Sequence, residues 1–550
     1  MTGDDRLTRD VLHWLRDRRG SRRAAVRRIG FVVYVALLFS AIYGWPVVLS
    51  VAHSLETGHV RGAAGHAVIP SLPLGLACLF VIVLVGACRN ALWRGPVVLS
   101  EADVVWLLPT ALDRRRLLWP RAARAIGGAA VGGALFGALG AVLVNAVHPH
   151  VGGRLVAGMT GFGCVTAVVA VAAAAVVEGS ERVASGVRRF WICGLGLSVL
   201  LGVLTAERAS GRSWTWADRV VVWSGPWGWA AQLPVALDRG SAAAAPVALG
   251  LVVLLTAVVV VGAFRCVSRL TAESLRSRAQ IDGRVGADLF VGDARSARLQ
   301  IQRERSATLT TGFRVRVPRS RRLVIAWRDL IALLRAPGRA AWAAVFVVGA
   351  TLVLGVGIAV SSTHDPAPAA IAVAVLCGYG AAAVLLEVGR VDNDRPEVTA
   401  QLPLRFSDIA RRHVVVAAAV LAVFAAIAGA VVAGRFGAPP WPAAVAAIAA
   451  APVLVGAASV NVYRKATPVE WLGVDPYGIG FSFVLFWLIL GPLLALVALV
   501  PSTAAIFSAL RHGSAPGAAI GSFVASCAVA TAAALFLVTH RAQARARAAR

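Results

Sequence analysis

Long apolar runs alternate with short polar segments along almost the whole chain of 550 residues. Each run has about 17 to 25 residues, which lets a helix cross roughly 30 Å of hydrocarbon. The pattern predicts an all-α, polytopic membrane protein with twelve transmembrane helices. We expect them at residues 29–51, 71–88, 125–147, 155–177, 190–206 and 245–264, and at 341–360, 369–387, 414–434, 442–460, 479–500 and 517–539.

The order of the runs predicts two repeated halves, because six runs precede a basic stretch of about 75 residues and six follow it. We expect a first half over 1–264, a cytoplasmic linker over 265–320 and a second half over 321–550. Each half opens with apolar residues that share one face of an amphipathic helix. Such a helix would lie flat at the membrane surface, with or without a role beyond anchoring. The two apolar sets are Leu7, Val11, Trp14 and Leu15, and Leu323, Trp327, Leu330 and Leu334.

Composition agrees with this pattern. Hydrophobic residues make up 58% of the chain, charged residues only 15%, and the mean hydropathy is +0.74. A soluble globular domain of this size would carry about 25% charged residues. These values exclude a soluble protein and indicate an integral membrane protein.

A net charge of +28 could indicate a nucleic-acid partner, so the positions of the basic residues decide its meaning. Of the 55 Lys and Arg residues, 47 fall in segments that the spans place on one side, and eight on the other. The positive-inside rule assigns the basic side, with both termini, to the cytoplasm. We therefore expect a multi-pass bacterial plasma-membrane protein that contacts the lipid bilayer and no nucleic acid. Arginine supplies 54 of the 55, a bias typical of a GC-rich genome.

The sequence lacks the usual motifs for metal or nucleotide binding. Its seven cysteines include no C-x-x-C spacing, which argues against a disulfide framework or a zinc site. No G-x-x-x-x-G-K-[ST] motif is present, and Lys465, the only lysine, follows no glycine loop. We expect no cofactor, no metal and no enzymatic activity in this chain.

A polar stretch after the second predicted span, "LSEADVVWLLPTALDRRRLLWPRA" over 99–122, has a definite local pattern. Ser100 with Asp103, and Thr110 with Asp113, fit the capping-box signature. We expect two short capped helices separated at Pro109, suited to docking on another protein. The alternative is a connecting loop whose arginines only satisfy the positive-inside rule.

A second copy of this pattern follows the second span of the other half, over 391–413. Both copies order an acidic patch, a Leu-Pro turn, an Asp and paired arginines. The first copy has Glu101, Asp103, Leu108, Pro109, Asp113, Arg114, Arg115 and Arg116, and the second has Asp392, Asp394, Glu397, Leu402, Pro403, Asp408, Arg411 and Arg412.

This arrangement of an amphipathic helix, six spans and a helical loop after the second span resembles the permease subunit of ABC-2-type exporters. "WRDLIALLRAPGR" resembles the helix before their first span, and "PVVLSEADVVWLLPTALDRRRLL" resembles a motif in uncharacterised actinobacterial members. The resemblance implies that a separate ABC ATPase subunit docks on the loop. ABC-2 permeases commonly have six spans and pair, whereas this chain holds two halves, so a homodimer remains open. The candidate docking residues are Trp106, Asp113, Arg114, Arg115, Arg116, Asp408, Arg411 and Arg412.

Two other functions are weighed beside export. A secondary transporter normally needs charged residues inside its spans, and the interiors of the predicted spans contain none. An intramembrane lipid or prenyl-type transferase would need carboxylates for Mg²⁺ and a diphosphate. Asp392, Asn393, Asp394 and Glu397 form one such cluster, although a solvated loop explains it as well.

Two further patterns concern the outer side and the packing of the spans. Ala129, Gly133, Gly137 and Ala141 recur every four residues in the third span, which predicts close packing of another helix. The loop between the fifth and sixth spans is rich in tryptophan, which is typical of an interfacial anchor. The resemblance to ABC-2 permeases implies instead a re-entrant lid over the pathway. These tryptophans are Trp214, Trp216, Trp223, Trp227 and Trp229.

Overall fold

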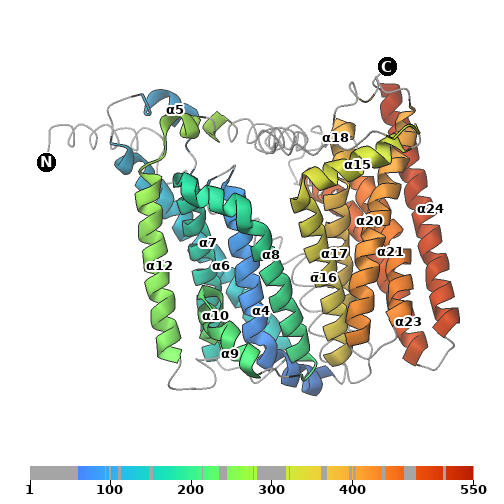
Figure 1. Cartoon of the computed structure of the whole chain (residues 1–550), viewed down its shortest axis with the longest axis horizontal. Helices are drawn as coiled ribbons and strands as arrows, with labels where there is room; N and C mark the ends of the chain where they lie inside the picture. Colours follow the sequence, from blue (N-terminus) through green and yellow to red (C-terminus); the bar gives the residue numbers. More distant parts are fainter. Residues whose placement is uncertain are drawn as a thin grey trace. The chain divides into compact units, whose positions relative to one another are not determined.

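In a computed structural model of the chain, every element among the described residues is a helix, which confirms the predicted all-α class for them. The helices are drawn in Figure 1. The described residues are 60–92, 95–97, 99, 101–109, 113–147, 153–212, 215–234, 245–276, 278–280, 318–320, 323–360, 368–394, 399, 404–435, 440–463, 479–511 and 516–548. The helices are α4 (Val60–Ala91), α5 (Glu101–Trp106), α6 (Arg114–Val147), α7 (Gly153–Gly179), α8 (Glu181–Ala209), α9 (Thr215–Trp223), α10 (Pro226–Ala231), α12 (Ala245–Val267), α15 (Val324–Arg335), α16 (Pro337–Val360), α17 (Pro368–Leu385), α18 (Glu387–Asp394), α20 (Phe406–Arg435), α21 (Pro440–Val462), α23 (Ile479–Arg511) and α24 (Pro516–Ala548).

Ten of the described helices are long and apolar enough to cross a membrane, which makes the chain a multi-pass membrane protein. They are α4, α6, α7, α8, α12, α16, α20, α21, α23 and α24, and each overlaps one predicted run. The pair α17 and α18 passes the same test together and bends by 54° between its two parts. The predicted run over 29–51 and the amphipathic segment from Leu7 to Leu15 lie outside the described residues.

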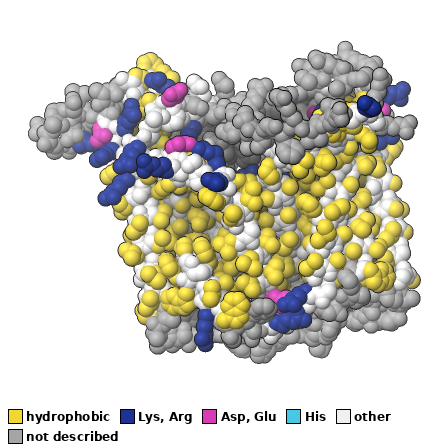
Figure 2. Space-filling model, viewed as in Figure 1, with side chains coloured by type: hydrophobic (Ala, Val, Ile, Leu, Met, Phe, Trp, Pro, Cys, Tyr) yellow, Lys and Arg dark blue, Asp and Glu magenta, His cyan; other side chains and the backbone are white. Residues whose placement is uncertain are grey.

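The chain divides into two compact units. Unit 1 comprises 1–65, 79–191 and 216–283, and unit 2 comprises 66–78, 192–215 and 284–550. The outer surface of the spans is apolar in both: Leu135 of α6 and Val431 of α20 are among the large hydrophobic side chains left exposed. Figure 2 shows such side chains over the middle of the spans and arginines gathered at the end where α5 lies. This is the surface expected where lipid replaces water around the helices.

In unit 1, α6 packs along α7, and α12 packs on α7 and also contacts α6. Glycine makes the first contact possible, because a Cβ at Gly133 would lie 2.3 Å from the Gly163 carbonyl oxygen. A Cβ at Gly137 would lie 2.2 Å from the carbonyl oxygen of Met159. The small-residue stripe predicted in the third span is therefore confirmed as a helix-packing face.

In unit 2, α16 packs with α17, and α20 and α24 pack with α21. The core is built from small and branched side chains, such as Ala451, Val455 and Leu421, around the fully buried Tyr463. The amphipathic helix α15 crosses the ends of these helices, beside α18 (Figure 1). It buries Ile325, Asp329 and Ile331.

One local prediction from sequence is wrong in detail. The second short helix expected after Pro109 is the start of α6, which continues from Arg114 into the span because Pro120 falls early in the helix. The predicted apolar face of α15 is turned away from the protein, and the helix buries the opposite face, which carries Asp329. Leu323, Leu330 and Leu334 are all about half exposed.

Candidate docking surface and buried charge network

The helix α5 holds Trp106 in an exposed position at one end of unit 1. The Trp106 side chain is 73% exposed, and Val105 beside it is also exposed. The opposite face of the segment is buried, since Val104, Leu107 and Leu108 join a hydrophobic cluster with the end of α12. An exposed tryptophan on a firmly packed helix is typical of a protein interface.

A buried ion pair ties α5 to α6. Arg121 Nη2 donates to Asp103 Oδ2 at 2.6 Å, and both side chains are largely buried. Arg121 Nη1 also donates to the Leu117 carbonyl at 2.6 Å, which fixes the guanidinium along α6. Asp103 therefore fixes the position of α5, whereas Ser100, its expected capping partner, lies outside the described residues.

Asp113 is the N-cap of α6. Its Oδ1 accepts a hydrogen bond from the backbone N–H of Arg115 at 3.0 Å, as an N-cap side chain does for the second helical residue. The capping box predicted from Thr110 placed Asp113 inside a helix, and this register is wrong. Arg114 and Arg115 are exposed in the first turn of α6, and Arg116 is half-buried. We call Val105, Trp106, Arg114 and Arg115 the α5 platform.

The segment before α5 is anchored by Glu178, at the end of α7. The Glu178 carboxylate forms an ion pair with Arg278 and accepts a hydrogen bond from the backbone N–H of Val97. Gly95 is required beside it, because a Cβ there would lie 1.9 Å from the Glu178 carboxylate. The platform is thus attached to α6, α7 and the segment after α12.

A network of buried charges joins α15, α18 and α20 in unit 2. His413 Nδ1 lies 2.6 Å from Asp329 Oδ2, and His413 Nε2 lies 3.0 Å from Asp392 Oδ2. Arg328 forms an ion pair with Asp392 and also lies beside the imidazole. We call Arg328, Asp329, Asp392 and His413 the α15 network.

His413 Nδ1 and Nε2 both lie within hydrogen-bond distance of a carboxylate oxygen, and Nε2 also lies 3.1 Å from Arg328 Nη2. The His413 side chain is 1% exposed, so these neighbours supply the hydrogen bonds that a buried polar group needs. Tyr463 lies close by and is fully buried, and burial together with the two carboxylates raises the pKa of its phenol.

The other candidate docking residues of the second copy lie at the surface. Asp408 and Arg411 form an ion pair at 2.5 Å within the first turn of α20, with the Arg411 side chain 53% exposed. Arg412 is half-buried next to them. The structure therefore separates the half-buried Asp408 and the exposed Arg411 from the buried α15 network.

The carboxylates weighed as a Mg²⁺ site have other partners. Asp392 is paired with Arg328 and His413, and Asn393 Nδ2 donates to the Val462 carbonyl at 2.7 Å. The Asp394 side chain and Glu397 lie outside the described part. Among the residues the structure describes, no group of three His, Cys, Asp or Glu side chains is placed to hold a metal ion.

The tryptophan-rich loop forms two short helices, α9 and α10. Trp216 and Trp223 are exposed on α9, whereas Trp227 and Trp229 are half-buried on α10, which packs against α7 and α12. Gly228 allows the tight reversal, because a Cβ there would lie 2.3 Å from the Val221 carbonyl oxygen. Trp214 lies outside the described residues. A lid and an anchor both remain compatible with this hairpin.

Ion pairs also join α8 and α20 at the end of unit 2 away from α15. The largely buried Glu207 accepts hydrogen bonds from Arg435, one of them at 3.1 Å. Arg212 donates to the Arg435 carbonyl at 2.8 Å.

Sequence reasoning missed Arg121, Asp329 and His413, although a signal was present. In each half, an acid after the second span pairs with a base on the helix of the third span: Asp103 with Arg121, and Asp392 with His413. A buried base at the start of an apolar helix needs such an acid.

Comparisons with known proteins identify a family. The profile of a family of unknown function, DUF6297, matches residues 65–471. Searches of curated proteins and of solved structures find no match. Because the matched region covers most of the chain, including α5 and the α15 network, the protein belongs to the DUF6297 family.

Proposed function

We propose that the protein is the membrane permease subunit of an ATP-driven, ABC-type exporter, energised by a separate ATPase subunit. The observation that carries the proposal is the exposed Trp106, held on a short helix that a buried ion pair and a hydrophobic cluster fix in place. A connecting loop needs neither an exposed tryptophan nor rigid support. A docking element needs both, because a preorganised surface loses less entropy on binding.

The chemistry of the platform suits a protein partner. Trp and Arg are the side chains that most often dominate interface energetics, commonly at about 2 kcal/mol or more when central. Trp106 is exposed on α5, and Arg114 and Arg115 are exposed at the start of the next helix, α6. We infer that the platform binds an acidic, apolar-centred groove on the ATPase, and that Asp408, Arg411 and Arg412 contact a second copy.

The attachment of the platform supports a rigid-body mechanism. Asp103 links α5 to α6, and Glu178 links the preceding segment to α7. A movement of the docked ATPase would pass directly into these spans. Opening on the opposite side would require contacts such as Glu207–Arg435 to separate.

The test is co-purification of a P-loop ATPase with variants of this chain from native membranes. We expect Arg114→Glu with Arg115→Glu, and separately Trp106→Ala, to release most of the ATPase while the protein stays inserted. Arg411→Glu with Arg412→Glu should cause partial loss, and all four changes complete loss. Trp441→Ala is the matched control. Trp441 is also exposed, but it lies at the first turn of α21, whereas α18 contacts the last residue of that helix, Val462.

Normal recovery of the ATPase with the combined variant would show that both loops are only connectors. The purified chain alone should neither bind nor hydrolyse ATP. Transport that persists without ATP and collapses with the proton gradient would favour a secondary transporter instead.

A further inference from the structure

A pocket in unit 2 lies under α15, at the break between α17 and α18, and its walls are mostly apolar. The bend of 54° between α17 and α18 leaves room beside Leu386. The cavity has a volume of about 20 Å³. That volume admits the end of an acyl chain or a small polar group, and the rest of a ligand would lie in the opening of the pocket.

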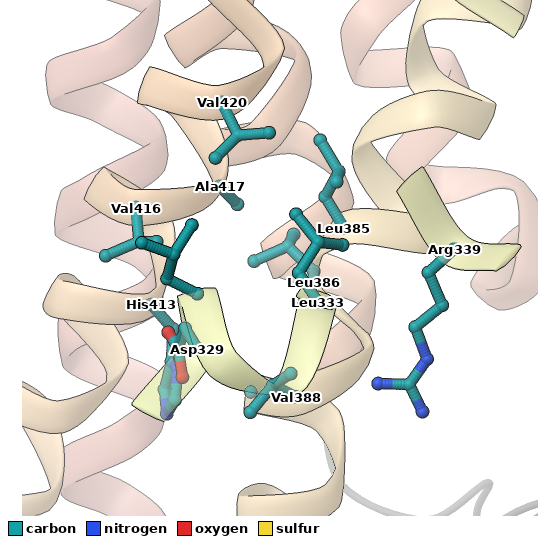
Figure 3. Close-up of a pocket in the computed structure, with 12 residues that line it drawn as sticks. Asp329, Leu333, Arg339, Leu385, Leu386, Val388, His413, Val416, Ala417 and Val420 are labelled. Atoms are coloured by element: carbon teal, nitrogen blue, oxygen red, sulfur yellow. Dashed lines mark hydrogen bonds and ion pairs between the residues drawn. The ribbon is translucent and has the colours of Figure 1, made fainter. Parts of the chain in front are cut away.

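The two charged sides of this pocket differ in sign. Figure 3 shows Asp329 beside His413 on one side and Arg339 on the other. Asp329 is largely buried, and its Oδ1 receives no hydrogen bond; Arg328 Nη2 lies 3.9 Å from it, and His413 contacts the other carboxylate oxygen. Among the described residues, the Arg339 guanidinium has no hydrogen-bond partner or ion pair. A buried acceptor without a donor is costly, so a ligand that donates to it gains affinity.

We propose that this pocket binds one membrane phospholipid whose headgroup carries both a phosphate and a primary ammonium group, as in phosphatidylethanolamine. The phosphate would pair with Arg339, and the ammonium would donate to Asp329 Oδ1. The apolar wall that includes Leu333, Val416 and Val420 would contact the adjoining chain.

The position of α15 favours a lipid over a soluble ligand. Leu323, Leu330 and Leu334 form an exposed apolar stripe on this amphipathic helix, as in helices that lie in the membrane interface. Leu330 also lines the pocket, so the stripe and the pocket wall are continuous. A lipid can therefore enter from the bilayer without crossing water.

The test is thermal unfolding of the delipidated, detergent-solubilised full chain on addition of defined lipids. We expect phosphatidylethanolamine to raise Tm by several degrees more than phosphatidylcholine at the same mole fraction, because a quaternary ammonium has no N–H to donate. Soluble glycerophosphoethanolamine should give a much smaller rise, since it lacks the chains. Native mass spectrometry should find one phosphatidylethanolamine retained.

Two variants and a control make the test specific. Arg339→Gln should abolish the extra rise with phosphatidylethanolamine, and Leu333→Trp should do so by filling the pocket. Arg335→Gln should behave as wild type, because Arg335 is on α15 and does not line the pocket. Equal effects of the two lipids on wild type, or an unchanged response in Arg339→Gln, would overturn the assignment. A larger rise in Tm with phosphatidylglycerol than with phosphatidylethanolamine would also overturn the assignment, because phosphatidylglycerol has no ammonium group. None of these outcomes depends on an ATPase.

Discussion

Several charged side chains near the ends of the described spans are buried beside an opposite charge. Asp103 has Arg121, Glu178 has Arg278, and the α15 network holds two carboxylates around His413 and Arg328. Removing one member of a buried pair leaves an uncompensated charge, whereas an exposed pair contributes little. The two kinds of pair therefore predict different responses to mutation.

Asp392→Ala should lower the free energy of unfolding by about 3–5 kcal/mol, because it leaves His413 and Arg328 without their shared carboxylate. Asp408→Ala is the matched control, since its partner Arg411 is half exposed, and should cost at most about 1 kcal/mol. Denaturant unfolding in mild detergent measures both. Equal losses from the two variants would contradict a structural role for the α15 network.

Residue-level prediction from sequence was right about the surface position of Trp106, Arg114, Arg115 and Arg411, all of which are exposed, while their docking role stays a prediction. It was wrong about the register of the capping box at Thr110. It failed for His413 and Asp329, which meet across 84 positions of the sequence. Only the folded chain brings such residues together.

At the scale of helices, apolar run length located the spans well, because the bilayer imposes one length on all of them. The helix ends were less predictable: α6 and α8 extend several residues beyond their apolar runs. The apolar face of α15 was predictable from the spacing of its leucines, but the burial of Asp329 on the opposite face was not, because its partner His413 is 84 residues away in the sequence.

The contact between α6 and α7 gives a prediction at this scale. Gly137→Leu should destabilise the protein by about 1–3 kcal/mol or more, because its side chain would meet the Met159 backbone. Gly132→Leu is the control on the same helix, since a Cβ at Gly132 meets nothing within 4 Å. Thermal unfolding of the two variants in detergent separates them. A tolerated Gly137→Leu would mean that the two helices do not pack this closely in the membrane.

For the whole molecule, the charge distribution predicts the topology. In a cysteine-free background, single cysteines at Met1, Arg316 and Arg550 should resist a membrane-impermeant thiol reagent in intact cells. A cysteine at Trp223, which is exposed on α9, should react. The expected reason is the excess of arginine on the cytoplasmic side. Labelling at Arg316 from outside would exclude two six-helix halves with both termini in the cytoplasm.

The two predicted halves share a buried ion pair that the pattern of spans alone does not reveal. An acid following the second span pairs with a base on the next span, as Asp103–Arg121 in one half and Asp392–His413 in the other. The similar positions of the two ion pairs favour two diverged copies of one unit, and the repeat stays a prediction. In the first copy the ion pair holds α5, which carries the exposed Trp106, and in the second it helps to fix α15.

The most direct test of the account is photo-crosslinking in living cells from a photoreactive residue placed at Trp106, with Trp216 as the control site. Both tryptophans are well exposed, but they belong to α5 and α9, at opposite ends of unit 1 (Figure 1). We expect ultraviolet light to join position 106, and not position 216, to a polypeptide whose peptides include a P-loop sequence. Crosslinking of position 106 to lipid alone, or of position 216 to the ATPase, would contradict the central claim.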